Sequence, residues 1–246
     1  MQLANRTVFI AGGTSGIGLG LARRLADLGS TVVVGGRSPE RVTDLEAVRI
    51  DVTDPASVAE ARDAVLAAHP ELDLLVTMSG VMLMEDLRDP AHFAAAEQTI
   101  DVNLLGTIRV IDAFTPHLLA RGSGDIVTVS SGIAFLPFPL MASYAASKAG
   151  VHAYSEALRA QLAGAGVGVT ELVPPAVATA GQENVNPAAL PLDGFLDEVL
   201  GLLGQQPTPN EIVVEKALEH RWAERDGTYA ELVARRSQSL ASLPGR

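Results

Sequence analysis

A short apolar run, a glycine-rich loop and a helical segment follow one another without a break near the start of the chain. Residues 7–11 have the β-branched and aromatic content of a buried strand, and residues 19–28 carry leucine and alanine at helical spacing. Between them stand Gly12, Gly13, Gly16 and Gly18. Glycines allow the backbone to approach a pyrophosphate closely, and the N-terminus of the following helix attracts phosphate. This context favours nucleotide binding over an ordinary strand-to-helix turn.

Apolar runs of strand length alternate with helical segments along the chain. Strands are predicted at 7–11, 31–35, 47–50, 72–77, 125–129, 167–173 and 211–214, and a long helix at 91–120. Such alternation predicts βαβ units with right-handed crossovers, and therefore an α/β fold with a parallel sheet. The sequence shows no repeat and no second domain, so we expect residues 1–246 to form one domain.

The segment after the sixth predicted strand has a different character. Residues 180–191 contain Gly, Asn, Gln and Pro without a clear period, which indicates a mobile loop, and a helix is predicted at 193–203. Because this loop leaves the C-terminus of a strand, we expect a lid over the site in the region of about 180–204. The tail, 215–246, is expected to be helical and polar, with Trp222 and Tyr229 docking it.

Charge and composition exclude several classes of function. The net charge of −11 disfavours nucleic acid as a partner, since an acidic surface repels phosphates. No cysteine is present, which removes disulfide and thiolate chemistry and fits a cytoplasmic location. We see no signal-peptide pattern and no membrane-spanning run, so a membrane role is not expected. We also expect no metal site, because the histidines are scattered without ligand spacing: His69, His92, His117, His152 and His220.

Tyr144 and Lys148 are four residues apart in a predicted helix, so their side chains share one face. Tyrosine normally titrates near ~10, and a neighbouring cation stabilises the phenolate. The pair is therefore a candidate acid–base that exchanges a proton with a substrate oxygen. Two further facts favour this interpretation over a surface helix with one Tyr and one Lys. Lys148 and Lys216 are the only lysines in the chain, and Ser131 ends a predicted strand upstream.

Four other polar residues stand at predicted strand ends or inside a predicted helix. Ser131 is placed to hold a substrate oxygen, although strand-end serines often only cap a turn. Arg37 follows the second strand with no carboxylate before Glu40, which favours the 2′-phosphate of NADP over the ribose of NAD, or else marks a solvated loop. Asp51 ends the third strand, where it could accept a hydrogen bond from an adenine. Asn103 lies among apolar neighbours, where an amide is more often a satisfied core residue than a catalytic one.

Residues 11–18, Asn103, Ser131 and the Tyr144-x-x-x-Lys148 motif together resemble the short-chain dehydrogenase/reductase family, over roughly residues 7–179. Within that family the chain looks most like bacterial oxidoreductases that have two prolines after the sixth strand and a helical C-terminal tail. The resemblance implies a Rossmann-type doubly wound parallel sheet, an NAD(P) cofactor and a small-molecule substrate. It also implies a homodimer or homotetramer packed through the helices around Asn103 and Tyr144.

The resemblance further implies a role for each matched residue. Tyr144 would be the acid–base, Ser131 would hold the substrate carbonyl or hydroxyl, and Lys148 would bind the nicotinamide ribose and lower the pKa of Tyr144. Asn103 would hold a water in a proton relay toward Lys148. The cofactor-binding residues would be Gly12, Thr14, Ser15, Gly16, Ile17, Gly18, Arg37, Asp51, Val52, Gly80, Tyr144, Lys148, Val177 and Thr179.

The chain departs from the family pattern at three places. Ala11 stands where the family usually has Thr, which loses one hydroxyl hydrogen bond. Residues 77–79 are Thr-Met-Ser, where the family usually has Asn-Asn-Ala before Gly80, and Thr77 can replace only one of the lost bonds. Pro175 stands where glycine is commoner. These changes bear on cofactor affinity and leave the four catalytic positions untouched.

The leading hypothesis is an NADP-dependent carbonyl reductase or alcohol dehydrogenase. We expect the pocket to be lined by residues 133–141 and by the 180–204 region. Its substrate should be a small apolar molecule, because the first of these segments contains Phe135, Leu136, Phe138, Leu140 and Met141. Two alternatives remain open, because a fold does not fix a function. One is a regulatory protein that binds a nucleotide without turnover, and the other is a biosynthetic epimerase or cyclase that uses the same cofactor.

Overall fold

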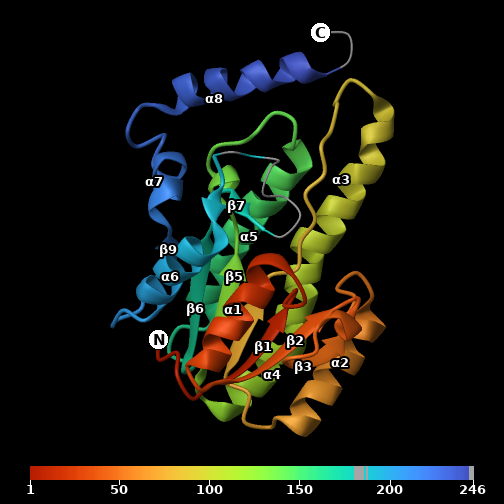
Figure 1. Cartoon of the computed structure of the whole chain (residues 1–246), viewed down its shortest axis with the longest axis vertical. Coiled ribbons are helices and arrows are strands. Elements are labelled where there is room, and N and C mark those ends of the chain that lie inside the picture. The colour runs from red at the N-terminus through yellow and green to blue at the C-terminus, as the bar shows by residue number, and fades with distance from the viewer. Residues whose placement is uncertain (180–185, 187, 244–246) are drawn as a thin grey trace.

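Seven parallel strands form one sheet in a computed structural model that describes residues 1–179, 186 and 188–243. The order across the sheet is β3-β2-β1-β4-β5-β6-β9 (Figure 1). The strands up to β3 are added on one side of β1 and those from β4 onward on its other side, so the strand order reverses between β1 and β4. Every predicted strand is confirmed within two residues at each end: β1 (Thr7–Ala11), β2 (Thr31–Gly36), β3 (Glu46–Arg49), β4 (Leu74–Thr77), β5 (Gly124–Val129), β6 (Val167–Val173) and β9 (Glu211–Val213). This is the Rossmann-type α/β fold that the sequence predicts.

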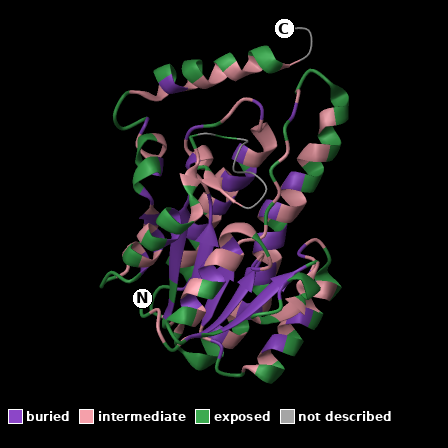
Figure 2. Cartoon of the chain, in the orientation of Figure 1, coloured by how far each residue is buried: buried purple, intermediate pink, exposed green. Residues whose placement is uncertain are grey.

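Helices cover both faces of the sheet, because strands buried on two sides expose apolar residues to each. One face packs against α1 (Gly16–Asp27) and α6 (Leu192–Leu203), and its core includes Ile10 and Phe195. The other packs against α2 (Pro55–Ala68), α4 (Gly106–Arg121) and α5 (Ala142–Gln161). Phe9 stacks on Phe114 there with ring centroids 5.0 Å apart. Figure 2 shows that the buried residues concentrate in the strands and on the helix sides that face them.

The long helix predicted at 91–120 is present, but its winding changes midway. A short turn, η2 (Pro90–His92), leads into α3 (Phe93–Ile100), and a π-helical turn, η3 (Asp101–Leu105), joins α3 to α4. Asn103 lies in the π-helical turn and is fully buried. π-turns are rare and are frequently found at functional sites, so this irregularity marks a place that periodicity alone does not reveal.

The C-terminal part of the chain returns to the sheet and then crosses over the end of it. The short strands β7 (Val177–Ala178) and β8 (Leu190–Pro191) pair, and α6 follows. After β9 come α7 (Glu215–Arg221), α8 (Tyr229–Ser237) and a 3₁₀ turn, η5 (Gln238–Ser242). Besides η2, earlier parts of the chain contain the 3₁₀ turns η1 (Pro39–Arg41) and η4 (Gly132–Ala134). Tyr229 packs against Leu136 and Leu232, whereas Trp222 lies between Arg221 and Arg225.

Of the predicted lid, residues 180–185 and 187 lie outside the described residues. Residues 192–203 form α6, whose buried side packs on α1. Figure 1 shows α8 lying across the upper end of the molecule, with α3 rising toward it from the other side. Within the described ranges, no helix has the length and apolarity that crossing a bilayer requires.

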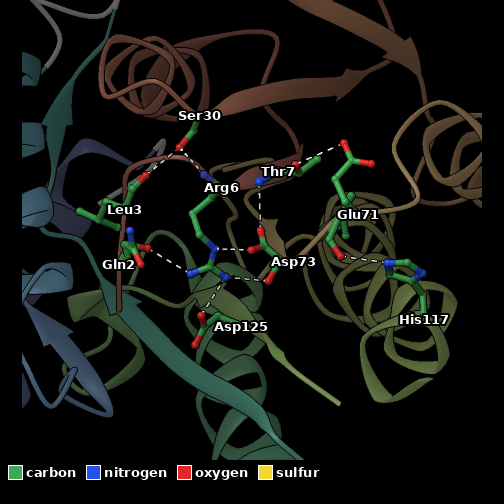
Figure 3. Close-up of polar contacts among 10 residues, drawn as sticks. Gln2, Leu3, Arg6, Thr7, Ser30, Glu71, Asp73, His117 and Asp125 are labelled. Atoms are coloured by element: carbon green, nitrogen blue, oxygen red, sulfur yellow. Dashed lines mark hydrogen bonds and ion pairs between the residues drawn. The ribbon is translucent and has the colours of Figure 1, made fainter. Parts of the chain in front are cut away.

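An arginine ties the central strands together at their N-terminal edge. Arg6 Nε donates to Asp73 Oδ2 at 2.8 Å, and Arg6 Nη2 donates to Asp125 Oδ2 at 2.9 Å (Figure 3). Thr7 N donates to Asp73 Oδ1 at 3.0 Å. Arg6 precedes β1, Asp73 precedes β4 and Asp125 lies in β5, so one guanidinium links three neighbouring strands.

Candidate functional site

The loop between β1 and α1 brings backbone segments together so closely that only glycine fits. Gly12 has a φ of +90°, and a Cβ on it would lie 2.4 Å from the backbone nitrogen of Ser79. A Cβ on Gly18 would lie 2.2 Å from Gly12 O. The Ser15 hydroxyl makes no capping bond to the first turn of α1. The loop thus presents bare backbone and an uncapped helix N-terminus, which fits the diphosphate of a dinucleotide.

The carboxyl ends of β2 and β3 form the next part of the site. Arg37 is exposed there and makes no ion pair among the described residues. Asp51 Oδ1 accepts hydrogen bonds from Thr53 Oγ1 at 2.7 Å and from Thr53 N at 3.0 Å. These bonds, together with the charge of Arg37, lower the pKa of Asp51. The Asp51 carboxylate is therefore ionised near the guanidinium of Arg37.

The altered segment after β4 keeps its place at the glycine loop. Met78 N donates to Ala11 O at 2.7 Å, so the backbone of the segment remains joined to the end of β1. Thr77 Oγ1 donates to Val127 O at 3.5 Å, a long contact that partly fulfils the bracing role expected of Thr77. The departures from the family pattern therefore change side-chain contacts without displacing the loop from β1.

Ser131, Tyr144 and Lys148 converge on one cavity at the carboxyl edge of the sheet, with a volume of about 2010 Å³. Ser131 follows β5, while Tyr144 and Lys148 lie in the first half of α5. Lys148 Nζ lies 5.8 Å from the centroid of the Tyr144 ring and donates to Val129 O at 2.8 Å. Ser130 also lines this cavity, and its Oγ is buried without a hydrogen-bond partner in the described part of the chain.

The pKa of Tyr144 corrects one sequence-based expectation. Burial raises it to about 12, with a hydrogen bond from Ser131 opposing the shift, whereas we expected Lys148 to lower it. The physical reason is that the buried phenol loses water, which destabilises the phenolate more than the hydrogen bond from Ser131 stabilises it. Burial lowers the pKa of Lys148 to about 8, and the charge of Glu171 opposes that shift.

Asn103 lies just beneath the cavity rather than on its surface. Its Nδ2 donates to Val81 O at 2.9 Å and its Oδ1 accepts from Val81 N at 2.8 Å. Nδ2 also lies 3.2 Å from Ser147 Oγ. A Cβ built on Gly80 would be 3.4 Å from Asn103 Oδ1 and 3.9 Å from Lys148 Nζ, so the amide and the ammonium both lie beside Gly80. Its side chain fixes the loop after β4 against α5, and the role of Asn103 in a proton relay stays a prediction.

The structure brings the predicted site residues together with two partial exceptions. Asn103 is buried below the cavity, and Gly16 is not on its wall, although a Cβ there would contact Thr179 at 3.5 Å. The other predicted residues line the cavity: Gly12, Thr14, Ser15, Ile17, Gly18, Arg37, Asp51, Val52, Gly80, Ser131, Tyr144, Lys148, Val177 and Thr179.

Part of the expected apolar lining is placed elsewhere. Phe138, Leu140 and Met141 do face the cavity, but Leu136 is fully buried under the tail. Phe135 packs on His152, with ring centroids 4.7 Å apart. The reason is that η4 turns these two side chains toward α5 and the tail helices.

Several sets of cavity residues were not predicted from the sequence, and two of them stand out. One is Val81, Met82, Leu83 and Met84, and the other is Lys216, Glu219, His220 and Arg236 from the tail. The tail residues are separated from Tyr144 by more than half of α5, four strands and α6. Nothing in their spacing distinguishes them from a solvated helix face. The scarcity of lysine was the one signal available, since Lys216 is the only lysine besides Lys148.

Comparison with known proteins places this site in context. The sequence model of the family described as short chain dehydrogenase matches residues 6–189. The uncharacterized oxidoreductase DltE of Bacillus subtilis is 35% identical over 188 residues, which cover 73% of this chain and 74% of DltE. Sulfoacetaldehyde reductase 2 of Chromohalobacter salexigens is 35% identical over 178 residues, covering 68% of this chain and 71% of that protein.

A solved structure agrees over nearly the whole length. A short chain dehydrogenase from Burkholderia cenocepacia in complex with NADP superposes with a TM-score of 0.83 at 28% sequence identity, covering 95% of this chain and 99% of that one. The similarity therefore extends beyond the range of the family model and includes the region of the C-terminal tail.

Proposed function

The chain belongs to the short-chain dehydrogenase/reductase family of oxidoreductases, and on this basis we propose that it transfers a hydride between NADP(H) and a carbonyl or secondary alcohol group of a small organic substrate. One observation carries the proposal: Ser131, Tyr144 and Lys148 open into the same cavity as the glycine loop. A proton donor and a dinucleotide cradle that share one cavity are what such a reaction needs.

We assign the proton to Tyr144 and the orientation of the substrate oxygen to Ser131. A bound nicotinamide supplies or accepts the hydride. With a pKa of about 12, Tyr144 keeps its proton at neutral pH and donates it from Oη to a carbonyl oxygen during reduction. Lys148, with a pKa of about 8, is largely charged at neutral pH and stabilises the phenolate that donation leaves behind. In the oxidative direction Tyr144 must first lose its proton, so we expect alcohol oxidation to accelerate as the pH rises.

The preference for NADP rests on Arg37. It lies on the cavity wall beside Asp51, where an adenosine ribose would stand, and has no carboxylate partner among the described residues. Arginine binds phosphate through several parallel donors and retains its charge at every working pH. The Burkholderia relative was solved with NADP, which supports the same cofactor here.

The subunit and cellular assignments are part of the proposal. Phe93 and Leu105 are 66% and 42% exposed on the helix formed by α3 and η3, which supports a homodimer or homotetramer packed through this region. We place the protein in the cytoplasm. The reaction direction that we favour is carbonyl reduction, as in the sulfoacetaldehyde reductase from Chromohalobacter.

The test begins with fluorescence titration of the protein with NADPH and NADH. We expect tighter NADPH binding, and Arg37→Ser should weaken NADPH about tenfold or more while changing NADH little. Tyr144→Phe should still bind NADPH but lose about 100-fold or more in kcat on any carbonyl substrate found by screening. Full turnover by Tyr144→Phe would refute the assigned chemistry. Tight NADPH binding with no turnover across the screen would favour a regulatory nucleotide-binding protein.

A further inference from the structure

The C-terminal tail forms a wall of the cavity opposite the glycine loop. Lys216 and His220 come from α7, and Arg236 comes from α8. All three belong to the same cavity as Ser131 and Tyr144. They lie beyond residue 189, where the match to the family model ends, so the family assignment says nothing about them. Their chemistry must be read from the structure.

Arg236 fixes the hydrogen-bonding state of His220. Arg236 Nη2 donates to His220 Nε2 at 2.8 Å, and Arg236 Nη1 donates to the carbonyl of Leu136. A guanidinium has only donors, so Nε2 of the imidazole must accept and the ring proton must sit on Nδ1. Burial and the charge of Arg236 lower the pKa of His220 to about 4, so the ring is neutral at pH 7. His220 therefore offers an N–H donor through Nδ1.

That donor lies next to the reacting centre. A Cβ on Gly132 would come within 2.9 Å of His220 Nδ1, so the imidazole rests directly against the backbone at Gly132. Gly132 follows Ser131, which lines the cavity together with Tyr144. In the described part of the chain, Nδ1 has no hydrogen-bond partner. Tyr144, Ser131, Gly132, His220 and Arg236 thus all line the same cavity, and His220 joins Gly132 to Arg236.

The positive charge on this wall is only partly balanced by the carboxylates around it. Arg236 forms no ion pair among the described residues. Glu219 also faces the cavity and its charge acts on Arg236 and His220, but it is exposed and pairs with Arg235 at 3.3 Å. Lys216 donates to the carbonyl of Ala188 and has no carboxylate partner in the same described ranges. Two cations without ion pairs on one wall are notable in a chain with a net charge of −11.

We propose that Arg236 and His220 bind an anionic group of the substrate, so that the substrate is a carbonyl compound carrying a carboxylate or a similar oxoanion. Arg236 supplies the charge and His220 Nδ1–H supplies a second donor, while Met82, Met84 and Phe138 cover the apolar part of the molecule. This inference rests on the proposed reductase function, and it replaces a purely apolar substrate by an amphipathic one. Charge-assisted hydrogen bonds at a partly buried site give selectivity for the anion over a neutral analogue.

The test compares 4-formylbenzoate with its neutral methyl ester, by calorimetry on the protein loaded with NADP and by steady-state kinetics with NADPH. In the wild type we expect the acid to bind about 10- to 100-fold more tightly than the ester, with a similar difference in kcat/KM. Arg236→Met should remove most of the difference. Arg235→Met is the matched control, because it removes an equal charge from the next residue, which is exposed and paired with Glu219. It should keep the preference.

Equal binding of acid and ester by the wild type would overturn the proposal, and this comparison needs no variant to fold. An unchanged preference in Arg236→Met would overturn it as well. The calorimetric comparison also separates the two proposals. If the acid binds selectively but neither compound is reduced, the anion site stands and the reductase assignment fails for this pair. If both compounds are reduced without selectivity, the reductase assignment stands and the anion site fails.

Discussion

The pKa values of Tyr144 and Lys148 are shifted in opposite directions from their ordinary values, and burial is the main cause of both shifts. The pKa of Tyr144 rises to about 12 and that of Lys148 falls to about 8. Glu171 opposes the fall, since its carboxylate is fully buried in β6 and acts on Lys148 through space. One oxygen of Glu171 lies 2.8 Å from His152 Nδ1, and the other has no hydrogen-bond partner in the described residues. The charge of Glu171 therefore favours the protonated form of Lys148.

We predict that Glu171→Gln lowers the pKa of Lys148 further. The alkaline limb of the pH profile for carbonyl reduction should then move to lower pH, while kcat/KM near pH 6 stays within about threefold of the wild type. The measurement is kcat/KM across the pH range with NADPH saturating. Glu156→Gln is the control, because it removes an exposed carboxylate of α5 that pairs with Arg159 at 2.7 Å. If both variants keep the wild-type limb, Glu171 does not act on Lys148.

The unfolding free energy of Glu171→Gln gives a second, independent measurement. Glu171 is the largest cause that raises the pKa of His152 above 6.5, with Glu211 adding to it and Arg221 opposing it. A raised pKa in the folded state means that protonated His152 stabilises the fold below the ordinary value, and that this contribution is lost as the pH rises through the raised value. The difference in unfolding free energy between wild type and Glu171→Gln that arises from His152 should therefore shrink with rising pH.

Which residues the sequence could predict depends on how local their signal is. Tyr144, Lys148 and the glycine loop follow from spacing within one helix and one turn, so the sequence locates them. Glu171 and Arg236 have no such pattern. Arg236 meets Leu136, a hundred residues earlier, only because α8 folds back over η4. The raised pKa of Tyr144 was also beyond reach, since burial depends on the complete packing around α5.

At the scale of the element, the first turn of α5 is bound by the buried carboxylate of Glu85. Ser143 N donates to Glu85 Oε2 at 2.7 Å, and Ser143 Oγ donates to Glu85 Oε1 at 2.8 Å. His92 Nδ1 lies 3.2 Å from the same carboxylate. Burial raises the pKa of Glu85, but these hydrogen bonds outweigh it, so the net pKa is lowered and the group is ionised. A carboxylate at a helix N-terminus satisfies free N–H groups and opposes the helix dipole. Glu85 thereby anchors the turn that carries Tyr144.

We predict that Glu85→Ala costs about 1–3 kcal/mol of stability and about tenfold or more in kcat, because the first turn of α5 frays beside the reacting centre. Glu85→Gln should restore most of both, since an amide still accepts from Ser143 N. Unfolding midpoints in urea and kcat at saturating NADPH are the measurements. Asp54→Ala serves as control: Asp54 caps α2 by accepting from Ala56 N at 2.9 Å, so its loss should reduce stability without changing kcat. A normal kcat in Glu85→Ala would show that the cap is structural only.

At the scale of the whole molecule, the carboxyl ends and the amino ends of the strands carry different features. The cavity lies at the carboxyl ends of the strands, between the glycine loop and the tail helices. The opposite edge holds the Arg6 network, in which the guanidinium is 10% exposed and its two carboxylate partners are 23% and 24% exposed (Figure 3). Parallel sheets bind ligands at the carboxyl ends of their strands. Residues at the amino ends can therefore contribute to stability alone.

We therefore predict that Arg6→Met lowers stability without affecting catalysis. The substitution leaves Asp73 and Asp125 side by side without their cation, and we expect a loss of about 1–3 kcal/mol, below the value for a fully buried pair because both carboxylates are partly exposed. The kcat/KM of the folded protein should stay within about twofold of the wild type. Urea unfolding and steady-state kinetics measure the two quantities separately.

Two further variants test whether the loss comes from the three-strand link itself. Asp125→Asn removes one of the two carboxylates and leaves the bonds from Arg6 to Asp73, so its loss of stability should be smaller than that of Arg6→Met. Arg62→Met breaks an ion pair between neighbouring residues on the surface of α2 and should change stability by less than about 0.5 kcal/mol. An Arg6→Met protein that is as stable as the wild type would mean that the strands hold together without the guanidinium. One that stays folded but loses kcat would mean that the two edges of the sheet are coupled, and that the separation of stability from chemistry inferred here is wrong.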